Sequence, residues 1–198
     1  MTPQLVKKLR TSPRAPSIGA PLAAAPTAPR GVRPEAIAFL IDAYEGVGVR
    51  PGKGLPHAQE VADVLRRAGY DEATQVLALL HDVVEDTPRT VDDVREGFGG
   101  PMAGMVGALT EDPSLKRYGQ RKRDLRSRSM AAGSPVVDVA VADKIASLRH
   151  ALITHSTVSD RKLRHYTVML QLALGAGLAP ELCKELDGLI AQVAAVSA

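Results

Sequence analysis

The chain has 198 residues, of which 45% are hydrophobic and 24% charged, a composition ordinary for one globular domain. Its single cysteine excludes an internal disulfide or a Cys-rich zinc site, and its longest apolar runs are far below the roughly 18 residues that span a bilayer. We therefore expect a cytoplasmic protein with no membrane partner.

The net charge of +3 is unevenly distributed along the chain. Residues 1–33 contain six basic residues and no acidic residue, which leaves 19 basic against 22 acidic side chains in the remainder. This first segment is rich in Pro and Ala and has no sustained periodicity, so it is predicted to be a disordered basic arm. We expect nucleic-acid binding only through this tail.

From Pro34 onward the apolar residues recur at helical spacing, and no alternating β-strand pattern of useful length is present. Pro34 suits the first turn of a helix over 35–46, and Thr90 with Asp92 and Asp93 behind it predicts another helix start. The remaining helices are expected at 56–68, 72–86, 91–98, 101–110, 117–131, 136–154, 160–176 and 180–196. The sequence thus predicts an all-α single domain over 34–198, a bundle of about eight or nine helices.

The segment 77–90 joins an apolar helix to a group of chemically active side chains. The predicted helix ends in a group of four such residues, His81, Asp82, Glu85 and Asp86. On one continuous helix they would share a broad face. Carboxylates packed this closely repel one another unless a positive charge compensates them, and a divalent cation would do so. The alternative is a solvated acidic helix end with a surface histidine.

Two further positions favour the metal site. His57 opens a predicted helix, and Asp143 interrupts the apolar run of residues 139–148. A charge in such a buried helix is unfavourable unless it is paired or coordinated.

Together these residues resemble a known family. His57, then His81-Asp82, then Asp143 is similar to the H…HD…D signature of the HD-domain metal-dependent phosphohydrolases. The strings HDVVEDTPRT and ADKIASLR more narrowly resemble the hydrolase domain of the RelA/SpoT family, above all the stand-alone small alarmone hydrolases (MESH1-like). The resemblance runs from about Arg50 to Tyr166.

The resemblance implies an HD-domain helical bundle that hydrolyses ppGpp or pppGpp and releases pyrophosphate from the 3′ position, giving GDP or GTP. It implies one manganese ion, although the mixed nitrogen and oxygen ligand set suits other divalent metals too. Glu85 and Asp86 match the catalytic acidic pair, or else serve as hydrogen-bond acceptors behind the ligands. The implied ligands are His57, His81, Asp82 and Asp143.

An alarmone carries several negative charges, so cations should surround its site. The run 121–123 also fits a solvated basic helix face, and Lys144 also fits a role in neutralising carboxylates. The substrate-binding positions that the resemblance implies are Arg50, Lys53, Arg121, Lys122, Lys144, Ser147, Lys162 and Tyr166.

The chain departs from the family pattern at the nucleotide site. Ser147 stands where the family has Asn, Lys162 stands for Arg, and the basic element at Arg50–Lys53 is altered. These changes leave open a phosphatase for another nucleotide, such as NADPH or an adenosine alarmone, and a non-catalytic alarmone-binding module. The oligomeric state stays open.

Overall fold

The computed structural model describes residues 32–196. The predicted disordered arm therefore lies outside the described residues, apart from its last two positions. These two residues are helical, because the first helix begins at Val32 and not after Pro34. The Arg33 guanidinium bonds Gln75 (2.8 Å) and Asp63 (3.3 Å), which ties the start of this helix to the folded body.

The described residues form nine helices and no strand, which confirms the all-α prediction. They are α1 (Val32–Tyr44), α2 (Leu55–Arg67), α3 (Glu72–Leu80), α4 (Val83–Asp86), α5 (Val91–Leu109), α6 (Tyr118–Ala132), α7 (Val136–Ile153), α8 (Asp160–Gly175) and α9 (Pro180–Val196).

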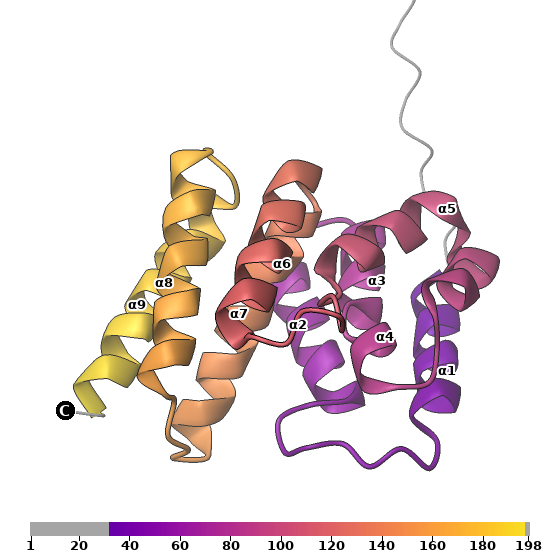
Figure 1. Cartoon of the computed structure of the whole chain (residues 1–198), viewed down its shortest axis with the longest axis horizontal. Helices are drawn as coiled ribbons and strands as arrows, with labels where there is room; N and C mark the ends of the chain where they lie inside the picture. Colours follow the sequence, from indigo (N-terminus) through magenta and orange to yellow (C-terminus); the bar gives the residue numbers. More distant parts are fainter. Residues whose placement is uncertain (1–31, 197–198) are drawn as a thin grey trace, which may run out of the picture.

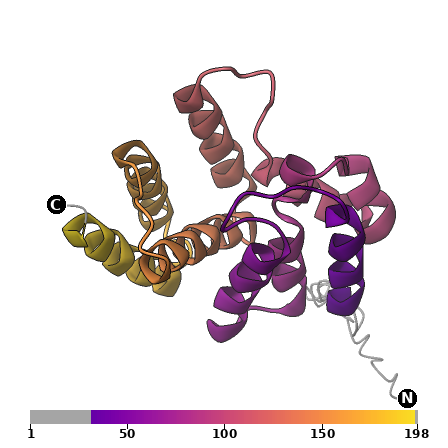
Figure 2. The same cartoon turned by 90° about the horizontal axis from the view of Figure 1, so that it is seen from below.

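Helix α7 lies at the centre of the bundle. Its near-continuous apolar residues are buried, and it contacts α2, α3, α5, α6, α8 and α9. Helices α8 and α9 pack at one end of the molecule and α1 at the other (Figures 1 and 2). Side chains on α7 can therefore meet groups from both halves of the chain.

The predicted helix over 72–86 is wrong in one respect, because it breaks at His81 and Asp82 into α3 and α4. The reason is a local hydrogen bond: His81 Nδ1 donates to the carbonyl of Ala78 (2.7 Å). In a continuous helix that carbonyl would accept from the amide of Asp82. The break therefore moves His81 and Asp82 out of a regular helix face.

Helix α5 contains the two segments that the sequence predicts over 91–98 and 101–110. They meet at Gly99, whose φ of 86° lies outside the helical region and is accessible to glycine at little cost. Thr90 and Asp93 form a reciprocal capping box at its start, as the Thr90 signal predicts. Across residues 32–196, every helix is too short or too polar to traverse a bilayer.

Candidate metal centre and anion pocket

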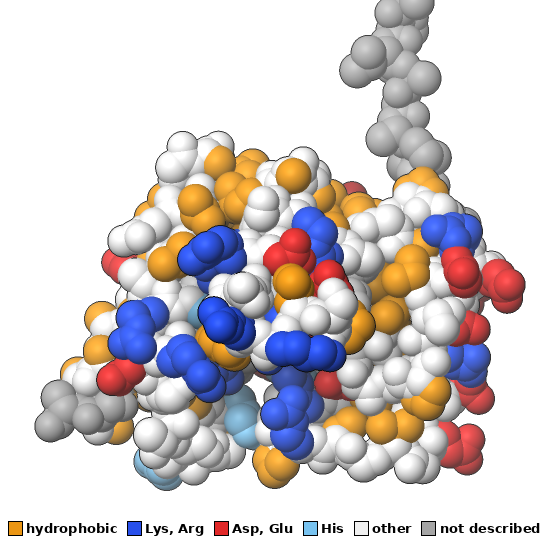
Figure 3. Space-filling model, viewed as in Figure 1, with side chains coloured by type: hydrophobic (Ala, Val, Ile, Leu, Met, Phe, Trp, Pro, Cys, Tyr) orange, Lys and Arg blue, Asp and Glu red, His pale blue; other side chains and the backbone are white. Residues whose placement is uncertain are grey.

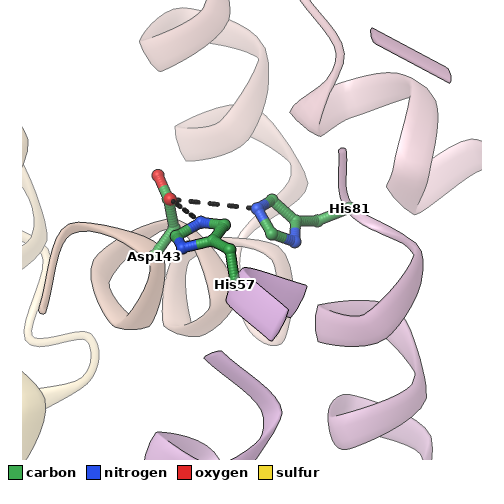
Figure 4. Close-up of side chains that lie close together, drawn as sticks. All are labelled: His57, His81 and Asp143. Carbon is green, nitrogen blue, oxygen red and sulfur yellow. Dashed lines mark hydrogen bonds and ion pairs between the residues drawn. The ribbon is translucent and has the colours of Figure 1, made fainter. Parts of the chain in front are cut away.

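Three side chains far apart in sequence converge beside α7 (Figure 4). His57 lies in the first turn of α2, His81 follows α3, and Asp143 lies in the middle of α7. One potential ligand atom from each lies within 4.8 Å of the others. Asp143 Oδ1 is 2.9 Å from His57 Nε2 and 3.8 Å from His81 Nε2. The three atoms thus surround a common point, as ligands of one ion would.

The environment of His81 fits a metal ion. Since Nδ1 donates to the Ala78 carbonyl, Nε2 faces the carboxylates and is the nitrogen that would bind a metal ion once it has lost its proton. This Nε2 is buried and has no hydrogen-bond partner among residues 32–196. A buried nitrogen in that state is unfavourable, and a cation at the centre would satisfy it. The donor set of imidazoles and carboxylates suits a divalent metal of the first transition row.

Asp82, the fourth predicted ligand, lies next to this trio. Its Oδ1 is 3.3 Å from His81 Nε2, and its Oδ2 forms an ion pair with Lys53 Nζ. The structure therefore groups three predicted ligands tightly and holds the fourth alongside, with one oxygen engaged by a lysine.

The carboxylates dominate the electrostatics of the centre. Burial opposes the charged form of His81, but Asp82 and Asp143 outweigh it and raise the histidine pKa to about 9. Burial likewise works against ionised Asp143, yet Lys144 and His57 hold its pKa well below the usual range. The carboxylates thus stay ionised, and a metal ion would take the place of the His81 proton beside them.

Glu85 and Asp86 lie on the short helix α4 beside these residues. Glu85 opens onto the cavity described below, and its Oε1 accepts a hydrogen bond from the backbone amide of Glu111 (2.6 Å). Asp86 Oδ2 is buried without a hydrogen-bond partner in the described part of the chain. Loss of hydration, followed by the charge of Asp82, raises the pKa of both carboxyls. Such a pair is suited to accept and return a proton.

A cavity of about 610 Å³ opens in front of these carboxylates. All eight predicted substrate-binding residues line it, together with His81, Asp82, Asp143 and the Glu85–Asp86 pair. His57 instead lines a neighbouring cavity of about 680 Å³, on the other side of the segment 50–53. All the predicted site residues except His57 therefore line one cavity. His57 lines the neighbouring cavity and contributes its imidazole to the metal centre between the two.

The cavity wall also contains residues to which the sequence analysis gave no role. The Arg161 guanidinium lies over the Tyr118 ring at 4.2 Å, and Arg126 Nη1 donates to His165 Nδ1 (2.7 Å). The Glu111 carboxylate pairs with both Arg121 and Lys122. Two signals were available in the sequence, because Arg161 precedes Lys162 and Arg126 follows Lys122 by one helical turn. Glu111 belongs to Leu109-Thr110-Glu111, a string that also resembles the RelA/SpoT hydrolase domain, although no role was assigned to it.

Cations outnumber acids on this wall, with eight Lys and Arg side chains against five Asp and Glu. Four of the five acids are Asp82, Asp143 and the Glu85–Asp86 pair, whereas Glu111 pairs with Arg121 and Lys122. Lys and Arg side chains gather over the α6 and α8 side of the molecular face (Figure 3). Burial, and then repulsion from Lys53, Lys144 and Lys122, outweighs Asp143 and lowers the pKa of Lys162. The net excess of positive charge on this wall favours a polyanionic ligand.

Comparisons with known proteins identify the family of the chain. The model of the family described as HD domain matches residues 36–170. The chain is 36% identical over 87 residues to the guanosine-3′,5′-bis(diphosphate) 3′-pyrophosphohydrolase MESH1 of Drosophila melanogaster, which covers 44% of this chain and 48% of that protein. It is 30% identical over 131 residues to the bifunctional (p)ppGpp synthase/hydrolase SpoT of Escherichia coli K12, covering 64% of this chain and 19% of SpoT.

Solved structures are similar as well. One is described as a metazoan ortholog of SpoT that hydrolyzes ppGpp; it has a TM-score of 0.68, 25% identity, and coverage of 84% of this chain and 97% of its own. Another, lmo0812 from Listeria monocytogenes EGD-e, has a TM-score of 0.62, 27% identity, and coverage of 74% and 97%. The chain spans about half the length of the fly relative and about a fifth of SpoT.

Proposed function

The chain belongs to the HD domain family, and we propose that it is a metal-dependent (p)ppGpp 3′-pyrophosphohydrolase acting in the cytoplasm. The observation that carries this proposal is the convergence of His57, His81 and Asp143 within 4.8 Å at the acidic end of a cation-lined cavity. The names of its MESH1 and SpoT relatives support the choice of substrate.

We assign the metal to His57, His81, Asp82 and Asp143, and we propose Mn²⁺ as the native ion. Bound there, a divalent ion would polarise a phosphoryl oxygen and lower the pKa of a water molecule. For Asp82 to contribute both oxygens, Lys53 would have to release Oδ2. Lys53 is then available to a phosphate oxygen at the mouth of the cavity.

The chain's own groups account for the proton movements of the reaction. Water attacks the phosphorus bonded to ribose O3′, the P–O3′ bond breaks, and pyrophosphate and GDP (or GTP) form. Glu85 and Asp86 take the proton from the attacking water and return one to O3′, a transfer that their raised pKa values favour near neutral pH. The Glu111 amide holds Glu85 in place during this transfer.

Substrate binding is assigned to the cationic wall. Arg121, Lys122 and Lys162 supply charge for the diphosphate groups. The Tyr166 ring is only 4% exposed, and we assign it to the edge of the nucleoside site, where Lys144 and Lys162 each lie 5.6 Å from its centroid. Ser147 offers one hydroxyl where an Asn would offer two donors and an acceptor. Contacts to the base are therefore weaker at this position than in the family pattern.

The test is product analysis with the purified full chain. We expect pyrophosphate and GDP from ppGpp with Mn²⁺, and no turnover in His81→Ala. His155→Asn is the matched control, because His155 is exposed, lies outside the cavity and has a φ of 52° that asparagine tolerates. Intact ppGpp after incubation with the wild type and each of several divalent metals would refute the proposal.

A second candidate keeps the chemistry and changes the nucleotide. Ser147 and the altered segment 50–53 both lie on the cavity wall, where they affect recognition and leave the metal centre intact. A panel containing ppGpp, NADPH and an adenosine alarmone, run at equal concentration, separates the two. Faster turnover of another nucleotide would replace ppGpp as the substrate.

A further inference from the structure

One peptide group connects helix α6 to Glu85. The amide of Glu111 donates to Glu85 Oε1 (2.6 Å), and the carbonyl of the same peptide unit, that of Thr110, accepts from Arg128 Nη2 (2.7 Å). A peptide unit is planar, so fixing the direction of its C=O also fixes the direction of its N–H. Arg128 therefore determines where the Glu111 amide points.

Arg128 is itself held firmly in this geometry. Its Nε and Nη2 both lie 2.8 Å from Asp124 Oδ2, one helical turn earlier on α6. Its Nη1 donates to the Gly107 carbonyl (2.7 Å). The guanidinium thus spans two carbonyls at the carboxyl end of α5 while a carboxylate fixes its other edge, a fork that lysine cannot reproduce.

The charges at the two ends of the peptide group reinforce each other. A guanidinium cation on the carbonyl side and a carboxylate on the amide side polarise the group in the same sense, which strengthens both hydrogen bonds. The neighbouring bond at the end of α5, from Ser129 Oγ to the Ala108 carbonyl (3.3 Å), involves a different peptide unit from the one that donates to Glu85.

We propose that Arg128 is a positioning residue for the hydrolytic reaction, which holds Glu85 through the Thr110–Glu111 peptide unit. This inference rests on the proposed function, in which Glu85 transfers a proton. Arg128 does not line the cavity, so it acts without touching the substrate.

The experiment compares Arg128→Gln, Arg128→Lys and the control Ser127→Ala in the full chain; Ser127 is exposed on the same helix and does not line the cavity. For Arg128→Gln we expect kcat to fall between about tenfold and a hundredfold, because a misplaced proton-transfer group is inefficient. KM for ppGpp should stay within about twofold. The acid limb of the kcat profile should move to higher pH, since Glu85 loses a donor that favours its ionised form. Arg128→Lys should be intermediate and Ser127→Ala close to wild type.

A second readout does not depend on activity. In ¹⁵N-glutamate-labelled protein, the Glu111 amide proton should resonate downfield and move in Glu85→Gln, which assigns it. We expect it to move upfield in Arg128→Gln and to stay in place in Ser127→Ala.

An unmoved Glu111 resonance in Arg128→Gln, or a pH profile equal to that of the wild type, would overturn the proposal. Lack of ppGpp hydrolysis by the wild type would refute the proposed function itself, and the resonance would then decide whether Arg128 orients Glu85. If Arg128→Gln does not fold, Arg128→Lys carries the same comparison.

Discussion

His165 makes the stability of the protein depend on pH in a way that can be calculated. The imidazole is only 6% exposed, and its Nδ1 accepts from Arg126, which requires a neutral ring. Burial, and then the charges of Lys144, Lys122 and Arg126, outweigh Asp143 and lower its pKa to about 2. These groups face it from α6 and α7.

The sign follows from the proton balance between the two states. An unfolded histidine has a pKa of about 6.5, so below that pH the unfolded chain binds a proton that the folded chain excludes. Stability is therefore lost as pH falls through 6.5, at a limiting slope of about 1.4 kcal/mol per pH unit. Between pH 6.0 and 4.5 this single group removes about 2 kcal/mol from the free energy of unfolding.

The perturbation is His165→Gln, whose amide oxygen can still accept from Arg126 but does not titrate. Urea unfolding followed by circular dichroism at pH 6.0 and 4.5 gives the loss of stability in each variant. The carboxylates titrate in both proteins, so subtraction isolates His165. We expect the wild type to lose about 2 kcal/mol more than His165→Gln, whereas the exposed His155→Asn should follow the wild type. Equal losses in wild type and His165→Gln would refute the burial argument.

Three further predictions concern the site. Mn²⁺ at a hundredfold above its Kd should stabilise the fold by about 2.7 kcal/mol, which corresponds to a rise of about 5–10 °C in Tm. EDTA or His81→Ala should remove this rise, and a Tm that no divalent metal changes counts against the metal centre. Glu85→Gln should retain that Tm gain but lower kcat by about a hundredfold or more, so full activity would exclude Glu85 from proton transfer. Ser147→Asn should lower KM for ppGpp about fivefold, since one added hydrogen bond contributes about 1 kcal/mol; an unchanged KM would show that this position does not contact the nucleotide.

Much of the fold could be predicted because its signals are local. The helices follow from apolar spacing and from caps such as Thr90, which depend on residues within one or two turns. The break at His81 escaped prediction because one side-chain hydrogen bond to Ala78 competes with the helix ladder, and spacing does not reveal it.

The site divides in a similar way. Histidines and carboxylates in apolar or closely packed positions indicate metal chemistry through residue type alone, and this pointed to His57, His81 and Asp143. The partners of the basic side chains carried no such signal, because they are distant in sequence. Lys53 pairs with Asp82, 29 positions away, and Arg126 donates to His165, 39 positions away. No sequence signal indicated the role of Arg128 either, because the two groups it contacts at the end of α5 are backbone carbonyls, which every residue possesses.

By itself, the order of amino acids specified a helical domain and the kinds of atoms available to bind a cation and a polyanion, since helix periodicity and ligand chemistry belong to short segments. Packing around α7 decided which of those atoms meet. Examples are the contact of His57 with Asp143 and the Thr110–Glu111 peptide unit that connects Arg128 to Glu85. These contacts depend on angles and distances between helices, to which many distant side chains contribute together.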